Sequence, residues 1–202
     1  MFVPDGVTFL DDYKKFIQFN RENIFSYLQE NNLFSKDCDL PILKSQMAKQ
    51  PLSFAQERLW FIDKYEEGTN AYNVPVIFKL SQDVRLDLLE RSLHSMVNRH
   101  EILRTLIQED AEGQGYQLVM DDKEYPLIIN KKAVGSRAAL DEEIRKEANH
   151  IYDLGKEYPI RVCILELAND TLISEYYLSL VIHHIAFDGW SFDILLKELR
   201  EY

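Results

Sequence analysis

A layered α/β fold, with helices packed on a largely β sheet, is the fold class that the sequence predicts. Hydrophobic residues make up 46% of the 202 residues, which is enough to bury a core. Segments with the helix period alternate with short extended segments in the order helix, strand, helix, hairpin, helix, two strands, helix. Elements in this order are typical of an α/β or α+β sandwich in which helices flank the sheet.

The first fifty residues are predicted to form a region of their own. Apolar residues between positions 8 and 31 recur at steps of three and four, which predicts one or two amphipathic helices. The stretch Phe34–Pro51 has no clear period and is interrupted by Pro41, which favours a linker. We therefore expect a helical extension and linker over residues 1–50, and the main domain over residues 51–202.

Two helices and a strand are predicted for the first part of the main domain. Leu52–Tyr65 has the helix period, and the turn-rich GTNAYNVP and the β-branched run VIFKL follow it. A second helix is expected to begin at Asp83, whose carboxylate can cap the first turn, and to end near RHEILRT. The residues expected to face the core are Phe54, Leu59, Trp60 and Ile62 on the first helix, and Leu89, Leu93, Met96, Val97 and His100 on the second.

The second part of the main domain predicts most of the sheet. Thr105–Gln108 and Gly115–Met120 are extended and flank the acidic turn EDAEGQ, which predicts a hairpin. A short strand is expected at Tyr125–Asn130, and a charged amphipathic helix at Ala138–Tyr152. Two longer strands, IRVCILEL and TLISEYYLSLVIHH, come next. The segment SFDILLKELREY keeps the helix period to its last residue, so we expect a helix cut off within a larger protein.

Composition excludes several classes of function. The net charge is −11, with 34 acidic against 23 basic residues, so we expect neither a nucleic-acid partner nor an anionic membrane surface. No apolar run is long enough to span a bilayer. Cys38 and Cys163 lie in separate segments without a CxxC pair, which argues against a disulfide framework or a zinc ribbon. A soluble protein of the cytoplasm fits these observations.

The sequence HHIAFDGWS, residues 183–191, ends the last predicted strand with two adjacent histidines. Because side chains alternate along a strand, Leu180, Ile182 and His184 share one face and His183 lies on the other. Two histidines on opposite faces do not bind one metal ion together, and no further ligand lies nearby at zinc spacing. We therefore expect no metal site here.

This histidine motif has the residue types that acyl transfer needs. An imidazole at the end of a buried strand can accept a proton near neutral pH, and His184 is our candidate. Asp188 can order the loop by pairing with an arginine, and Gly189 can let a backbone approach or donate an N–H to an oxyanion. No serine or cysteine elbow accompanies them, which favours direct transfer without an acyl-enzyme. The alternative is that both histidines are structural.

Three stretches together resemble the condensation domains of nonribosomal peptide synthetases. SFAQERLWFI (Ser53–Ile62), RHEILRT (Arg99–Thr105) and HHIAFDGWS are similar, in order and spacing, to the first three core motifs of that family. The resemblance covers Pro51–Tyr202. It implies the chloramphenicol-acetyltransferase-like fold, in which two lobes form a V around a tunnel. We expect this chain to hold the N-terminal lobe, without the C-terminal lobe and the later motifs.

The resemblance also implies roles for the residues of the last motif. His184 matches the family's catalytic histidine, a general base or a positioner of the amine, and His183 matches its structural neighbour. Asp188 matches the structural acid, which we expect to pair with Arg58 or, as second choice, with Arg161.

The remainder of the motif indicates the subtype. Gly189 matches the residue near the thioester, and Trp190 and Ser191 complete the form DGWS. This form, with SFAQERLW and the YN of AYNVP, is similar to the subtype that joins two L-residues. The motif residues that we interpret as structural are Leu59 and Trp60 in the core, Arg99 and His100 at a helix end, and Arg104 as an ion-pair or loop anchor.

Membership in this family would imply the reaction and the partners. The amine of an aminoacyl thioester on a downstream peptidyl carrier protein attacks the acyl or peptidyl thioester on an upstream carrier protein, which forms an amide. Phosphopantetheine arms of the carriers hold both substrates, so no cofactor is expected to bind directly. The other expected partners are the adenylation domain of the same synthetase and the missing C-terminal lobe, without which we expect the fragment to be inactive.

Two alternatives remain open at this point. The first is an acyltransferase of the same fold that makes esters or acylates a small amine, although SFAQERLW argues against it. The second is a non-catalytic docking platform for carrier proteins. Residues 1–50 lie outside the resemblance and are either a cap on the lobe or a docking segment for an upstream subunit; an exposed aromatic stripe would favour docking.

Overall fold

The computed structural model describes residues 49–66, 68–168 and 174–201. Contacts divide the chain into one unit that ends at Gln46 and a second that begins at Met47. The helices predicted between positions 8 and 31 lie outside the described residues. No described helix has the length and apolar character that a membrane span requires.

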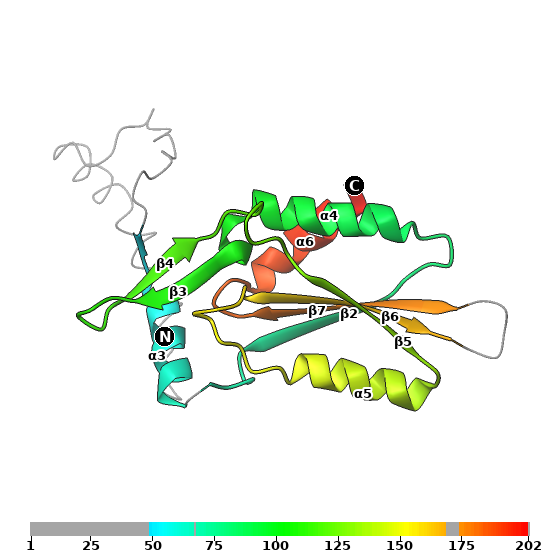
Figure 1. Ribbon diagram of the computed structural model, residues 1–202, viewed down its shortest axis with the longest axis horizontal. Coiled ribbons are helices and arrows are strands. Elements are labelled where there is room, and N and C mark those ends of the chain that lie inside the picture. The colour runs from blue at the N-terminus through cyan, green and yellow to red at the C-terminus, as the bar shows by residue number, and fades with distance from the viewer. Residues whose placement is uncertain (1–48, 67, 169–173, 202) are drawn as a thin grey trace, which may run out of the picture. The chain divides into compact units, whose positions relative to one another are not determined.

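A four-stranded mixed sheet forms the centre of the second unit, with the strand order β2-β7-β6-β5 (Figure 1). β7 pairs antiparallel with both β2 and β6, whereas β5 and β6 are parallel. The strands are β2 (Asn73–Lys79), β5 (Ile129–Val134), β6 (Ile160–Leu167) and β7 (Glu175–His183). β6 and β7 are buried along most of their length because both faces of the sheet are covered.

Helices cover the two faces of this sheet, as Figure 1 shows with α4 and α6 on one side and α5 on the other. Their bounds are α4 (Leu86–Arg99), α5 (Arg137–Ala148) and α6 (Gly189–Glu201). Alternate residues of β7 divide accordingly: Leu180 and Ile182 pack in the cluster with α4, and Val181 belongs to a different cluster. The predicted layered α/β class and the alternation along the last strand are therefore confirmed.

A smaller sheet carries the predicted hairpin beside the main sheet. Its strand order is β1-β4-β3, with β1 (Gln50–Pro51), β3 (Thr105–Glu109) and β4 (Gly115–Val119) all antiparallel to their neighbours. Helix α3 (Phe54–Tyr65) approaches this hairpin closely. A Cβ atom at Gly115 would lie 2.7 Å from Leu52 and 2.9 Å from Trp60, so a side chain at this position would push the helix away.

Four local predictions were wrong. Phe54 is 93% exposed, since it lies on the outer face of α3. Asp83 contacts Ser81, and α4 begins three residues later without a side-chain cap. The predicted strand at Tyr125–Asn130 is found at Ile129–Val134, where parallel pairing with β6 fixes its ends. The fourth concerns the end of α5.

Helix α5 ends at Ala148 and not at Tyr152 as predicted. Asn73, at the start of β2, donates its side-chain N–H groups to the carbonyl of Ala148 at 2.8 Å and to that of His150 at 2.7 Å. These two carbonyls are the acceptors that a longer helix would have used within itself. The side chain of Asn73 therefore stabilises the end of α5 at the edge of the main sheet.

Candidate functional site

The histidine loop connects the end of β7 to the start of α6, and its backbone is held on both sides. The N–H of His183 donates to the carbonyl of Pro159, and the N–H of His184 donates to that of Tyr72, both at 2.8 Å. His183 is the last residue of β7 and lies opposite Asn73 of β2. The sheet thus fixes the position at which the two histidine side chains diverge.

His183 is a buried structural residue. Its side chain is fully inaccessible, and its Nδ1 accepts a hydrogen bond from the N–H of Ile185 at 3.1 Å. The ring of Tyr152 meets it edge-on, with 5.7 Å between ring centroids. Burial, with a smaller contribution from the charge of His184, lowers the pKa of His183 to about 4. The imidazole is therefore neutral near pH 7.

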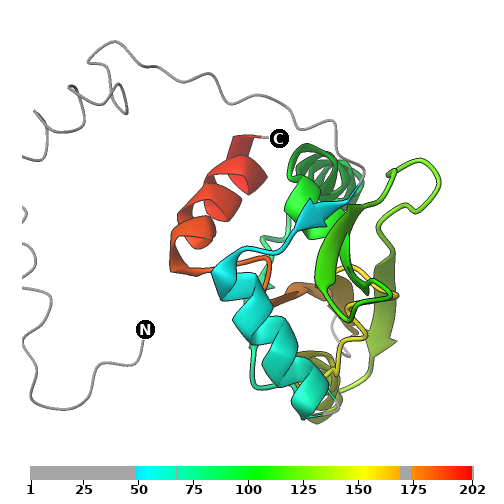
Figure 2. The same ribbon diagram turned by 90° about the vertical axis from the view of Figure 1, so that its left-hand side faces the viewer.

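His184 is exposed and lines an open groove of ≈ 530 Å³. All three sequence stretches that resemble the condensation motifs contribute to this groove. Its lining residues are Ser53, Ala55, Gln56 and Leu59 from the first stretch, Ile102 from the second, His184, Ile185, Ala186, Phe187, Asp188 and Ser191 from the third, and Gln117 of β4. Figure 2 shows the start of α3 (cyan) and the start of α6 (red-orange) beside each other at this place.

Gln56 joins α3 to the histidine loop, a role that was not predicted from the sequence. It completes a capping box with Ser53 at the start of α3. Its Nε2 donates to Oε1 of Gln117 at 3.1 Å and to the carbonyl of Ile185 at 3.4 Å. The spacing Ser-x-x-Gln could have indicated the cap, but the contact with a loop 129 residues further along the chain has no local signal.

Asp188 caps α6 and forms no ion pair with Arg58 or Arg161, which corrects our prediction. Its Oδ1 accepts hydrogen bonds from the backbone N–H of Ser191 at 2.9 Å and from the Ser191 hydroxyl at 2.7 Å. These bonds lower the pKa of Asp188 below its usual range. Arg161 binds Glu147 at 3.0 Å instead, and Arg58 is exposed and forms no ion pair within the described residues. The helix N-terminus satisfies the carboxylate.

Replacement of Asp188 by alanine is expected to lower the melting temperature of the chain by a few degrees, because α6 loses its cap. Thermal unfolding followed by circular dichroism measures this effect. The matched control is Asp193→Ala, which removes an exposed carboxylate from the same helix and should change little. Equal melting temperatures for the two variants would contradict the capping role.

Gly189 and Trp190, which follow the cap, face outward. Apart from its two chain neighbours and the backbone of its own helix turn, a Cβ atom built on Gly189 would meet no atom within 4 Å, so packing within the described chain does not require glycine there. Trp190 is 86% exposed. The surface beside the histidine loop is therefore open at the positions that the resemblance assigns to the thioester.

The second motif stretch anchors the helices that frame the loop. His100 Nε2 lies 2.8 Å from Oε2 of Glu198 in α6, and Arg99 lies 3.4 Å from the same carboxylate, which is 6% exposed. Arg104 donates to the carbonyl of Met120. The predicted structural roles of these residues are confirmed, and Leu59 and Trp60 pack, partly buried, against a core cluster. Glu198 was not singled out from the sequence.

A mixed sheet with helices on both faces, whose strand β7 leads into an HHxxxDG loop with one buried and one exposed histidine, defines a lobe of the chloramphenicol-acetyltransferase-like class of folds. Residues 46–202 match the family model described as Condensation domain. The chain belongs to this family, the condensation domains of nonribosomal peptide synthetases. The described residues contain no group of three or more His, Cys, Asp or Glu placed to hold a metal ion.

Its curated relatives are synthetases much longer than this chain. The chain is 43% identical over 149 residues to a probable non-canonical nonribosomal peptide synthetase of Salinispora arenicola. It is 41% identical over 149 residues to N-(5-amino-5-carboxypentanoyl)-L-cysteinyl-D-valine synthase of Amycolatopsis lactamdurans. Each alignment covers 74% of this chain but 2% and 4% of the respective relative, so the chain spans a small part of both.

Solved structures agree on the fold. The X-domain of teicoplanin biosynthesis, solved with OxyB, matches 78% of this chain and 33% of its own with a TM-score of 0.67 and 25% identity. The starter condensation domain of rhizomide synthetase matches 76% of this chain and 36% of its own with a TM-score of 0.64. Identity to the latter is 15%, which supports a common fold alone.

Proposed function

We propose that the chain is the N-terminal lobe of an amide-forming condensation domain and that His184 acts directly on the reacting groups. The observation that carries this proposal is the groove, because three separate motif stretches meet there around one exposed imidazole. The neighbouring imidazole, His183, is buried and neutral and so serves the fold. The family of the chain supports amide formation, and the DGWS form supports the subtype that joins two L-residues.

The proposed reaction needs a proton acceptor beside the attacking amine. When the amine nitrogen attacks the thioester carbonyl, the C–N bond forms, the C–S bond breaks, and the thiol leaves. The nitrogen loses one proton and the sulfur gains one, so a group that accepts or holds a proton near neutral pH assists both steps. His184 is that group in our proposal, and Gly189 leaves space for the thioester. Phosphopantetheine arms of upstream and downstream carrier proteins would bring the substrates.

The open groove supports the proposal that this lobe is inactive alone. Trp190 is 86% exposed, and no packed side chain covers Gly189, so water reaches the site freely. A single wall cannot hold two pantetheine arms in line or exclude water from the thioester. We propose that the second lobe supplies the opposite wall.

Single-turnover condensation, followed by mass spectrometry of donor and acceptor carrier proteins, tests the proposed function. This chain is compared with a version that extends through a second lobe. We expect amide only from the extended form. If neither form makes amide while a carrier protein still binds, the chain is a docking platform and the proposal fails.

A further inference from the structure

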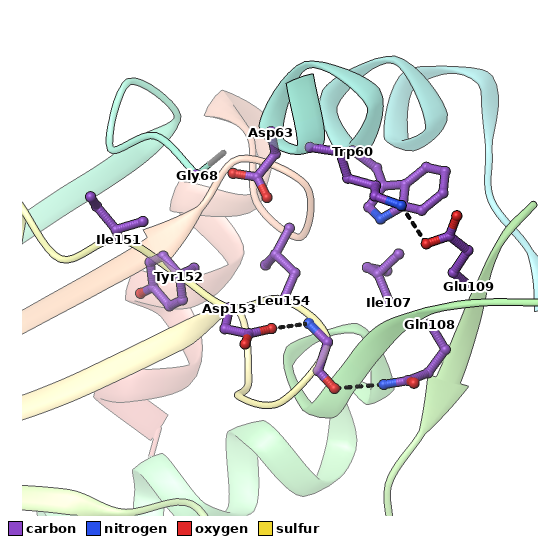
Figure 3. Close-up of a pocket in the computed structure, with 12 residues that line it drawn as sticks. Trp60, Asp63, Gly68, Ile107, Gln108, Glu109, Ile151, Tyr152, Asp153 and Leu154 are labelled. Atoms are coloured by element: carbon purple, nitrogen blue, oxygen red, sulfur yellow. Dashed lines mark hydrogen bonds and ion pairs between the residues drawn. The ribbon is translucent and has the colours of Figure 1, made fainter. Parts of the chain in front are cut away.

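A second cavity of ≈ 490 Å³ lies between α3, the end of β3 and the segment 151–155 (Figure 3). It shares no lining residue with the His184 groove. Ile107, Tyr152 and Leu154, each at most 5% exposed, give it an apolar inner wall, and Trp60 lies beside them. The cavity therefore offers an apolar inner wall, and its other lining residues include the exposed, charged Lys64, Glu109 and Asp153.

One buried carboxylate, that of Asp63, lines this cavity. Asp63 is 8% exposed, and Figure 3 shows its side chain pointing from α3 toward Leu154 and Tyr152. Its Oδ1 is buried without a hydrogen-bond partner, while the backbone N–H of Thr69 interacts with the carboxylate. The cavity thus contains an acceptor that the described fold leaves unused.

The neighbouring cations are already paired with other acids. Lys64, one residue after Asp63, binds Glu109, and Lys156 binds Asp153 at 2.7 Å. No described lysine, arginine or histidine forms an ion pair with Asp63. A buried, unpaired carboxylate destabilises the fold, because it loses hydration without gaining a partner. Burial, with smaller contributions from Asp153 and Glu66, accordingly raises the pKa of Asp63.

We propose that this cavity binds a single cationic amine or guanidinium group on an apolar stem. The N–H groups of the cation would donate to the Asp63 carboxylate, and the stem would pack against Ile107, Tyr152 and Leu154. The ring of Trp60 already accommodates a cation, since Lys64 Nζ lies 4.9 Å from its centroid. The same chemistry is offered by a free alkylamine and by a lysine or arginine side chain of a docked polypeptide.

An NMR titration of the full chain with n-butylammonium tests the proposal. It follows the chemical shifts of the backbone amides and of the Trp60 indole N–H. We expect saturable shifts at residues 151–155 and at the Trp60 indole, and none with the neutral isostere n-butanol at equal concentration. Asp63→Asn should weaken binding at least about tenfold, since one charge-assisted hydrogen bond is lost. The matched control Asp141→Asn, whose carboxylate is exposed, pairs with Arg137 and lies outside the cavity, should change the Kd less than about twofold.

Equal shifts with n-butanol, or unchanged binding in Asp63→Asn, would overturn the proposal. We expect Asp63→Asn to fold and to melt higher than the wild type near pH 7. The raised pKa means that the charged carboxylate disfavours the folded state above that pKa, and the amide removes this charge. If the variant fails to fold, the carboxyl ¹³C titration of Asp63 in the wild type decides the question. Saturating n-butylammonium should lower its pKa, and an unchanged pKa refutes the site.

A capped Gly-Lys-Gly peptide, with its norleucine counterpart as the neutral control, distinguishes the two sources of the cation. Tighter binding of the lysine peptide than of n-butylammonium assigns the site to a side chain of a docked polypeptide. Tighter binding of n-butylammonium assigns it to a free amine. Binding of neither ligand contradicts the proposal. Because the cavity and the His184 groove share no lining residue, these results do not depend on the proposed amide formation.

Discussion

His184→Ala, in a two-lobe domain that contains this chain, is expected to slow amide formation at least about a hundredfold and to leave the melting temperature nearly unchanged. The imidazole is exposed on the groove, and its ring forms no hydrogen bond within the described residues. The fold therefore loses little when the ring is removed, whereas the reaction would lose the proton acceptor that we propose. Single-turnover mass spectrometry and thermal unfolding of the same samples measure the two effects.

An exposed histidine away from the groove provides the control. His94 lies on α4, is also exposed, and lines none of the cavities described above. His94→Ala should keep both the turnover and the melting temperature of the wild type. Wild-type turnover in His184→Ala would remove this residue from the mechanism, and a large drop in melting temperature would assign it to the fold.

Acidification should destabilise the fold through His183 by about 3 kcal/mol. Its pKa falls from 6.5 in the unfolded chain to about 4 in the folded chain. Between these values the unfolded chain binds the extra proton, so the contribution of His183 to stability is complete above pH 6.5 and is lost as the pH falls toward 4. Urea unfolding at a series of pH values in this window, compared with His183→Gln, isolates the effect from that of the carboxylates.

The neighbouring histidine again provides the comparison. His184→Ala should retain most of the pH dependence of the wild type, because burial is the larger cause of the lowered pKa of His183 and the charge of His184 is the smaller one. His183→Gln should show a clearly weaker loss of stability in acid. The glutamine can still accept the hydrogen bond from the Ile185 N–H. A His183→Gln variant with the full wild-type pH dependence would show that the buried imidazole becomes protonated without cost.

The strands at the centre of the sheet could be predicted because strands buried on both faces have nearly continuous apolar sequences. Ile160–Leu167 is almost continuously apolar and forms β6 with the predicted bounds, since both of its faces are covered. The hairpin at residues 105–119 has a clear turn and two extended flanks, and it is also found. Local patterns therefore predicted the layered fold well.

Which charged side chains pair with each other could not be predicted from local patterns. Arg161 was a candidate partner for Asp188, but its guanidinium lies beside Glu147 of α5, whose carboxylate is 3% exposed. Asp188 finds its donors three residues away in Ser191. Which of several acids an arginine meets depends on helix packing across the sheet, and a single sequence contains no signal for it.

In the candidate site, too, local features could be predicted and long-range side-chain contacts could not. Strand alternation correctly separated His183 from His184, and three motif stretches indicated one site. The contact of Gln56 with the histidine loop and the unpaired Asp63 both depend on where α3 packs against the hairpin. Neither residue stands out in the sequence, because glutamine and aspartate on an amphipathic helix are most often solvated.

The pairing of β2 with β7 has a consequence for the way this lobe folds. Asn73 pairs with His183, so the two strands that meet are separated by about a hundred residues of chain. Such a pairing raises the contact order and slows folding, because the entropy of closing a long loop is lost before the strands gain their contacts. During synthesis β2 leaves the ribosome before β7, so the edge of β2 stays unpaired until β7 is made. An unpaired strand edge is prone to aggregation. The histidine loop leaves the same end of β7, so the site is complete only once the longest-range pairing has formed.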